Sequence, residues 1–128
     1  MKIKKLGFIV LAGLMLVLAA CQSADAGPTV IHVTLSEFAV MLDTDSVPAG
    51  HVTIEIENTG ALAHELVLEA AGSKDEPFET DGVASEAEDI EPGTTVSFEW
   101  DLEPGEYQLA CYVEGHFEAG MIQAFTVK

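Results

Sequence analysis

From residue 29 onward the chain alternates between apolar and polar positions, and a period of two predicts β-strands. The inward positions of the expected strands are Ile31, Val33 and Leu35, then Phe38, Val40 and Leu42, then Val52, Ile54 and Ile56, then Leu66 and Leu68, then Val96, Phe98, Trp100 and Leu102, then Tyr107, Leu109 and Cys111, and finally Phe125 and Val127. The alternation of apolar and polar positions shifts by one residue between the first two sets. A β-bulge near Ser36–Glu37 would explain this shift.

Turn sequences separate the expected strands, and one longer segment breaks the pattern. The turns are Val47-Pro48-Ala49-Gly50, Pro92-Gly93 and Pro104-Gly105. Ala71–Glu91 is acidic and has almost no apolar period, so we expect an exposed excursion with one short helical turn near Ala84–Glu88. Short strands joined by Pro-Gly turns, without a long helical pattern, predict an all-β sandwich or barrel.

The N-terminal segment has a different character. Basic residues precede an uncharged apolar run, Leu6–Ala20, which is shorter than the roughly 20 residues that span a bilayer. This run is typical of a signal peptide. It ends in Leu18-Ala19-Ala20-Cys21, which resembles the lipobox of bacterial lipoproteins. We therefore expect a signal peptide over 1–20, a lipidated Cys21, a tether over 21–28 and one extracytoplasmic domain over 29–128; the alternative is ordinary secretory cleavage that leaves a cysteine.

The charge of the chain excludes one class of partner. The formal net charge is −17, and loss of residues 1–20 would leave only Lys74 and Lys128 as basic residues against 22 acidic ones. Such a surface repels nucleic acid and anionic lipid, so any membrane attachment would come from the lipid anchor alone. A partner with a basic patch would be attracted. The acidity is equally compatible with a role in solubility only.

The cysteine content points toward a metal. If Cys21 carries lipid, Cys111 has no partner for an internal disulfide. A free thiol in an oxidising compartment needs another reason to be present, and metal ligation is one.

Residues that bind metals gather near the C-terminus. Cys111, His116 and Met121 follow one another at intervals of five residues, and a strand end, a loop and the next strand could bring them to one point. His64 lies upstream, directly after the Asn58–Ala63 loop. It shares the phase of the inward positions of its strand, so its ring should point into the domain.

These residue types favour copper over other metals. Two imidazoles, one thiolate and a weak axial thioether form the blue-copper ligand set. A structural zinc site more usually has four strong ligands, and calcium or magnesium would require oxygen ligands. Each residue alone has a more ordinary explanation, such as a core methionine or an inert buried thiol, so the prediction of one copper per chain rests on their joint arrangement. His32 and His51 fall on polar phases and should be solvated, whereas Met41 is expected in the core.

With these residues, the chain resembles a cupredoxin of the plastocyanin and azurin kind. The resemblance covers residues 29–128 and is carried by the Val47–Gly50 turn, the Asn58-Thr59-Gly60 approach to the first histidine, and the Cys111–Met121 loop. It implies a Greek-key β-sandwich that holds copper. The ligands implied by the resemblance are His64, Cys111, His116 and Met121.

The sequence departs from this family at two positions. Many relatives have Pro-Gly-His before the second imidazole, whereas this chain has Glu114-Gly115-His116. Many also place Asn directly after the first histidine, where this chain has Glu65. Groups around the ligands tune a metal, so the reduction potential is the property that transfers least from the family.

Three functions are compatible with these features. The first is a membrane-anchored, monomeric carrier of single electrons, whose partner would be a redox protein with a basic docking patch, such as a cytochrome or a respiratory complex. The second is binding, trafficking or storage of copper(I). The third is a binding lipoprotein that keeps the fold without metal. An enzyme is not expected, because multicopper oxidases and copper nitrite reductases need additional histidines and the sequence has no His-x-His pair.

Overall fold

The computed structural model describes residues 27–128, and the regular secondary structure in this range consists of β-strands. The predicted signal peptide, Cys21 and most of the tether lie outside the described residues. The strands are β1 (Thr29–Ser36), β2 (Ala39–Leu42), β3 (Ser46–Val47), β4 (Gly50–Asn58), β5 (His64–Ala70), β6 (Glu79–Thr80), β7 (Val83–Ala84), β8 (Glu86–Ile90), β9 (Thr95–Leu102), β10 (Gly105–Ala110) and β11 (Ile122–Val127). Between residues 27 and 128 there is no helix with the length and apolar character needed to cross a membrane.

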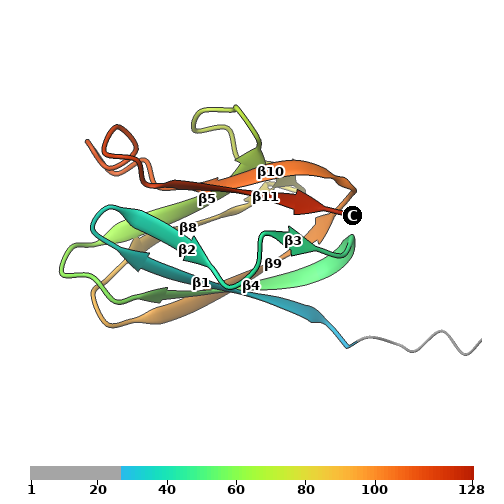
Figure 1. Ribbon diagram of the computed structural model, residues 1–128, viewed down its shortest axis with the longest axis horizontal. Helices are drawn as coiled ribbons and strands as arrows, with labels where there is room; N and C mark the ends of the chain where they lie inside the picture. The colour runs from blue at the N-terminus through green and yellow to red at the C-terminus, as the bar shows by residue number, and fades with distance from the viewer. Residues whose placement is uncertain (1–26) are drawn as a thin grey trace, which may run out of the picture.

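Two sheets form the sandwich (Figure 1). One sheet has the strand order β2-β1-β4-β9 and the other has the order β3-β11-β10-β5-β8, while β6 and β7 pair separately. The chain changes sheets repeatedly, including after β4, β8 and β9. These crossing connections confirm the predicted all-β Greek-key sandwich.

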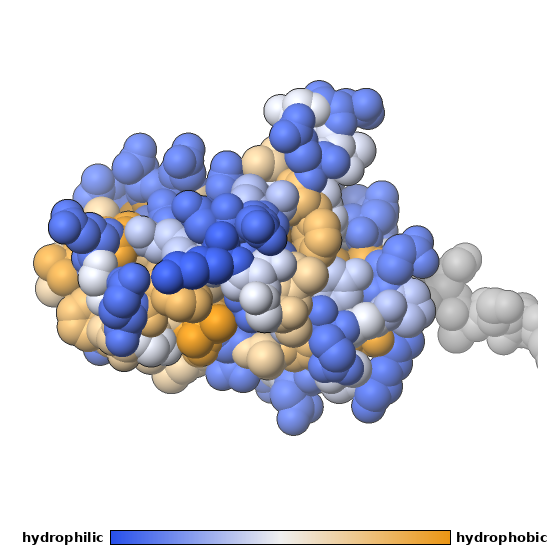
Figure 2. Space-filling model, turned by 90° about the horizontal axis from the view of Figure 1, so that it is seen from above, coloured by the Kyte–Doolittle hydropathy of each residue, from blue (hydrophilic) through white to orange (hydrophobic). Residues whose placement is uncertain are grey.

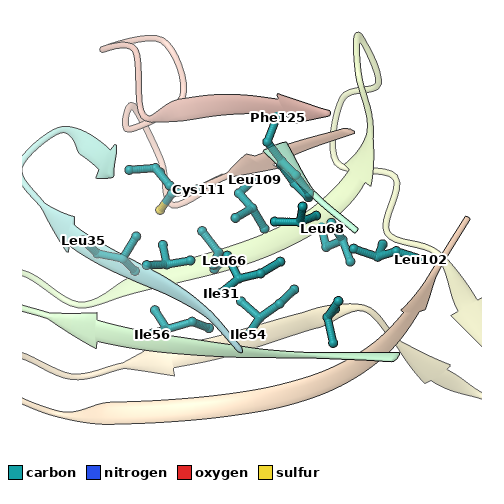
Figure 3. Close-up of a cluster of buried hydrophobic side chains, with 14 of the residues drawn as sticks. Ile31, Leu35, Ile54, Ile56, Leu66, Leu68, Leu102, Leu109, Cys111 and Phe125 are labelled. Carbon is teal, nitrogen blue, oxygen red and sulfur yellow. The ribbon is translucent and has the colours of Figure 1, made fainter. Parts of the chain in front are cut away.

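The apolar faces of the two sheets meet in one core (Figure 3). The predicted inward positions of β1, β4 and β5 are buried: Ile31, Val33, Leu35, Val52, Ile54, Ile56, Leu66 and Leu68. Burial of a side chain of this size contributes about 1.5–3 kcal/mol. Met41 was expected in the core, but its side chain is 49% exposed, because Val40 takes the inward position of β2.

The predicted β-bulge near Ser36–Glu37 is wrong. The chain instead reverses at residues 37 and 38, and β1 pairs antiparallel with β2 so that Ser36 lies opposite Ala39. Residues directly opposite each other in such a pair point to the same face. Leu35 therefore shares the core face with its partner Val40, and the reversal accounts for the phase shift.

The predicted helical turn near Ala84–Glu88 is also wrong. Glu86–Ile90 is the edge strand β8, which pairs antiparallel with β5. Ser85, just before it, is buried and its hydroxyl donates to the carbonyl of Leu68 at 2.6 Å. Ala and Glu favour helices in isolation, but the unpaired edge of β5 overrides that weak preference.

Candidate metal centre

The topology places the predicted ligands at one end of the sandwich. His64 is the first residue of β5, and Cys111 directly follows β10, the strand that pairs with β5. His116 and Met121 lie in the loop that connects β10 to β11. In Figure 1 this loop lies at the left, beside the β1–β2 turn and the connection before β5, and the start of β1 lies at the opposite end.

Three side chains converge on one point. The donor atoms of His64, Cys111 and His116 all lie within 4.8 Å of one another, and all three residues are buried. The Nδ1 atoms of the two histidines are 3.1 Å apart. The Cys111 Sγ atom lies 4.0 Å from His64 Nδ1 and 3.5 Å from His116 Nδ1. Each histidine therefore turns its Nδ1 atom toward the thiol.

Backbone hydrogen bonds hold the loop that supplies the other donors. The Cys111 N–H donates to the Met121 carbonyl at 3.0 Å, and the Met121 N–H donates to the His116 carbonyl at 3.1 Å. The Met121 side chain is buried in the same apolar cluster as Cys111. Gly115 has a φ of 82°, a conformation that glycine adopts without strain. These contacts give the loop a defined shape without the proline that many relatives have.

The buried site also controls the protonation of its donors. Burial raises the pKa of the Cys111 thiol, so a cation is needed to stabilise its thiolate. Burial and the neighbouring His116 ring lower the pKa of His64, which favours the neutral imidazole that binds metals. A metal would therefore displace a proton from Cys111 and find His64 already in its ligand form.

The ring of His64 has an unsatisfied outer nitrogen. Its Nε2 atom is buried without a hydrogen-bond partner, and Glu37 Oε1 lies 3.4 Å away. A neutral imidazole carries its proton on one nitrogen only. If Nδ1 binds a metal, this proton resides on Nε2 and faces the carboxylate.

The residue after the first histidine also contacts the site. Glu65 Oε1 accepts the backbone N–H of Tyr112 at 2.8 Å. This carboxylate thus fixes the backbone next to Cys111, at the position where many cupredoxins have asparagine. Burial raises the pKa of Glu65, and the neighbouring Asp75, Glu88 and Glu86 add to the shift.

The remaining histidines lie away from the centre. His32 Nδ1 is 3.1 Å from Glu55 Oε1 and His51 Nδ1 is 2.9 Å from Asp101 Oδ1, and both pairs are exposed. The expectation that these rings are solvated is confirmed.

Two residues at the centre were not predicted there. Phe38 was predicted as an inward strand position, but it precedes β2 and its side chain is 44% exposed. Glu37 and Phe38 form the β1–β2 turn, and the Phe38 ring meets the His116 ring edge-on with centroids 5.0 Å apart. Phe117, the residue after His116, stacks on Tyr112 with ring centroids 4.8 Å apart. No local pattern marks a turn residue as a neighbour of ligands far along the chain, because only the fold brings them together.

The model of the cupredoxin-like domain family matches residues 8–123. The chain belongs to this family. No curated protein matches it in sequence.

Reduced auracyanin from Roseiflexus castenholzii has a TM-score of 0.60 at 20% identity, with 80% of this chain and 99% of that chain covered. Auracyanin A from Chloroflexus aurantiacus, a "blue" copper protein, has a TM-score of 0.58 at 22% identity, with 80% and 100% covered. Reduced rusticyanin has a TM-score of 0.56 at 20% identity, with 80% and 81% covered. At these identities the likeness shows the fold alone.

The donor set of this cupredoxin-like domain fits a single copper ion. Two imidazole nitrogens and one thiol face a common point, and three such donors with a weak thioether suit copper in both oxidation states. A copper ion bound there would supply a one-electron redox couple. The protein would hold the donors in place, exclude water through burial, and release the Cys111 proton.

Proposed function

We propose that the protein is a carrier of single electrons, with one copper ion held by His64, Cys111, His116 and Met121. The observation that carries this proposal is the convergence of two Nδ1 atoms and one Sγ atom within 4.8 Å at buried positions. A rigid ligand set changes little between Cu(I) and Cu(II), which keeps the reorganisation on electron transfer small. The name of auracyanin A as a "blue" copper protein supports the same chemistry. On this proposal the protein is not an enzyme, because it transforms no substrate.

Copper(I) trafficking or storage is the competing function, since the same donors bind Cu(I). A copper donor often uses flexible, exposed segments rich in methionine or histidine. Here Cys111 and Met121 are fully buried, and only 6% of His116 is exposed. Such enclosure favours retention of the ion and therefore a carrier.

Electron exchange and metal transfer can be measured side by side. The Cu(I)-loaded protein is mixed with a thiol-rich acceptor of matched affinity while copper loss is followed, and electron self-exchange is measured in the same buffer. The Cys111→Ser variant is the control for loosely bound copper. A carrier exchanges electrons fast and keeps its metal. Fast loss of copper with slow self-exchange would replace the carrier with the trafficking function.

We also propose that Cys21 carries lipid and holds the domain on the outer side of a bacterial membrane. The sequence Leu18-Ala19-Ala20-Cys21 supports the anchor. The described chain begins at the end of the sandwich opposite the metal centre (Figure 1), so an anchored domain can point its centre toward a partner. Mass spectrometry of the mature N-terminus tests this proposal. An unmodified Cys21 thiol with a free α-amino group, or cleavage at another residue, would contradict it.

The proposed partner is a redox protein with a basic docking patch, such as a cytochrome or a respiratory complex, and not a nucleic acid. The face of the molecule shown in Figure 2 is largely hydrophilic, with smaller apolar areas. Phe38 and Leu62 are 44% and 47% exposed; we call them, together with Phe117, the apolar rim. Phe38 meets the His116 ring, so this rim offers a short route to the metal.

We further propose that the protein is a monomer. A dimer mass in analytical ultracentrifugation would contradict that state.

A further inference from the structure

The Glu37 side chain is hydrogen-bonded to the loop that leads into the metal centre. Its Oε1 atom accepts the backbone N–H groups of Ala61 and Leu62 at 2.8 and 2.9 Å. These two residues belong to the connection between β4 and β5, which ends at His64. The carboxylate therefore joins the β1–β2 turn to the segment that delivers the first histidine.

The third neighbour of this carboxylate is the His64 ring. Oε1 lies 3.4 Å from Nε2, which is buried and has no other partner. The Asn58 side chain has its own partners in this connection: its amide group donates to the Leu62 and Ile90 carbonyls and its oxygen accepts the Gly60 N–H. An N–H···O bond is usually 2.7–3.2 Å long, so a shift of about 0.2 Å or more would close it.

Gly60 provides the space for this arrangement. A Cβ atom at position 60 would lie 2.3 Å from Glu37 Oε1 and 2.9 Å from its carboxyl carbon. Real side chains do not approach so closely, so any larger residue would displace the carboxylate. The position of the Glu37 carboxylate thus requires a glycine at residue 60, although Glu37 lies between β1 and β2 and Gly60 lies between β4 and β5.

We propose that Glu37 is a positioning residue of the metal centre, whose carboxylate receives the Nε2–H of His64 and keeps Nδ1 directed at copper. This inference rests on the proposed copper site. Histidine ligands commonly donate their second N–H to a carboxylate or a carbonyl, which fixes the ring and makes it a stronger electron donor. A negative group at this position stabilises Cu(II) more than Cu(I). Glu37 therefore lowers the reduction potential of the site.

The decisive variant is Glu37→Gln. A glutamine oxygen still accepts the two backbone N–H groups, so the loop is retained while the charge is removed. We expect Cu(II) to lose about tenfold in affinity relative to Cu(I), which is a rise of about 59 mV in a one-electron potential. Glu118→Gln is the matched control, because it removes one exposed charge from the ligand loop without touching His64. The control should leave the potential nearly unchanged.

The Gly60→Ala change, made in wild type and in a Glu37→Ala background, distinguishes an effect of Glu37 from a general folding defect. Gly60→Ala should raise the potential in the same direction by displacing the carboxylate. In a Glu37→Ala background the same glycine change should have little further effect, because the crowded group is gone. Equal shifts of Gly60→Ala in both backgrounds would contradict the role of Glu37.

A spectroscopic readout reports on the proton itself. In the Cu(I) protein, proton NMR with ¹⁵N-labelled histidine should show a slowly exchanging His64 Nε2–H that moves upfield in Glu37→Gln. An unchanged potential and an unchanged signal in a coloured Glu37→Gln protein would overturn this inference alone. If wild-type protein forms no thiolate-to-copper band, the proposed function fails and this inference fails with it.

Discussion

Glu65 accepts the backbone N–H of Tyr112 at 2.8 Å, and this bond joins the residue after His64 to the residue after Cys111. His64 begins β5 and Cys111 directly follows the neighbouring strand β10, so the bond fixes the relative position of these two residues at the end of the sheet. The family position that many relatives fill with asparagine is thus filled here by another acceptor.

The first prediction concerns this bond. Glu65→Ala leaves the Tyr112 N–H without its acceptor. The bond is only partly buried, so we expect a loss of about 1 kcal/mol, the lower end of the cost of an unsatisfied buried donor. Glu65→Gln retains an acceptor oxygen and should cost less. Urea unfolding gives the free energies, and hydrogen exchange of the Tyr112 amide reports the bond directly. Equal stability and equal amide protection in wild type and Glu65→Ala would show that the bond contributes nothing.

Much of this centre could be predicted from the sequence, because it depends on local periodicity. The alternation of apolar and polar residues in β5 correctly predicted that the His64 side chain points inward. The spacing of Cys111 and His116 in one loop predicted that these two residues approach each other. Glu37 and Phe38 could not be found in this way, since they reach the centre through a turn that is distant in sequence. The edge strand β8 was missed for a related reason: its pairing with β5 is a tertiary preference, while its composition favours a helix.

The second prediction concerns Met121, which is buried in the same core cluster as Cys111. Met121→Leu conserves volume and should cost less than about 1.5 kcal/mol. The colour of the copper protein should survive, and the reduction potential should rise because a weak axial donor to Cu(II) is lost. Voltammetry and thermal unfolding of the variant measure these two effects. A lower potential would mean that Met121 does not act as an axial donor.

The third prediction is a pH effect away from the metal. The hydrogen bond to Asp101 raises the pKa of His51 above its ordinary value of 6.5, and the charges of Asp101 and Glu99 add to the shift. Because the folded-state pKa is the higher one, the resulting stabilisation is complete below pH 6.5 and is lost as the pH rises through the folded pKa.

NMR titration of the His51 ring protons tests this assignment. Asp101→Asn should bring the pKa back toward 6.5, and the variant should be less stable than wild type only at the acidic end of the range. His32→Gln is a control variant, since it removes a different exposed histidine. A His51 pKa that is the same in wild type and Asp101→Asn would refute the attribution.

The fourth prediction concerns docking. The chain carries a formal net charge of −17, so electron transfer to a basic cytochrome should slow as salt rises, because surface charges are screened over about 8 Å at physiological ionic strength. Transfer to an acidic cytochrome of similar potential serves as the control and should become faster with salt. A flat response with both partners would mean that the acidity serves solubility rather than encounter.

The claim of a copper centre built on Cys111 is tested most directly by the visible spectrum of the protein titrated with Cu(II). We expect one copper per chain and an intense thiolate-to-copper band that saturates at that ratio. The band should be absent from Cys111→Ser, and it should persist in His51→Gln, whose histidine lies outside the centre. A colourless wild-type protein, or a band that survives in Cys111→Ser, would contradict a copper centre built on Cys111.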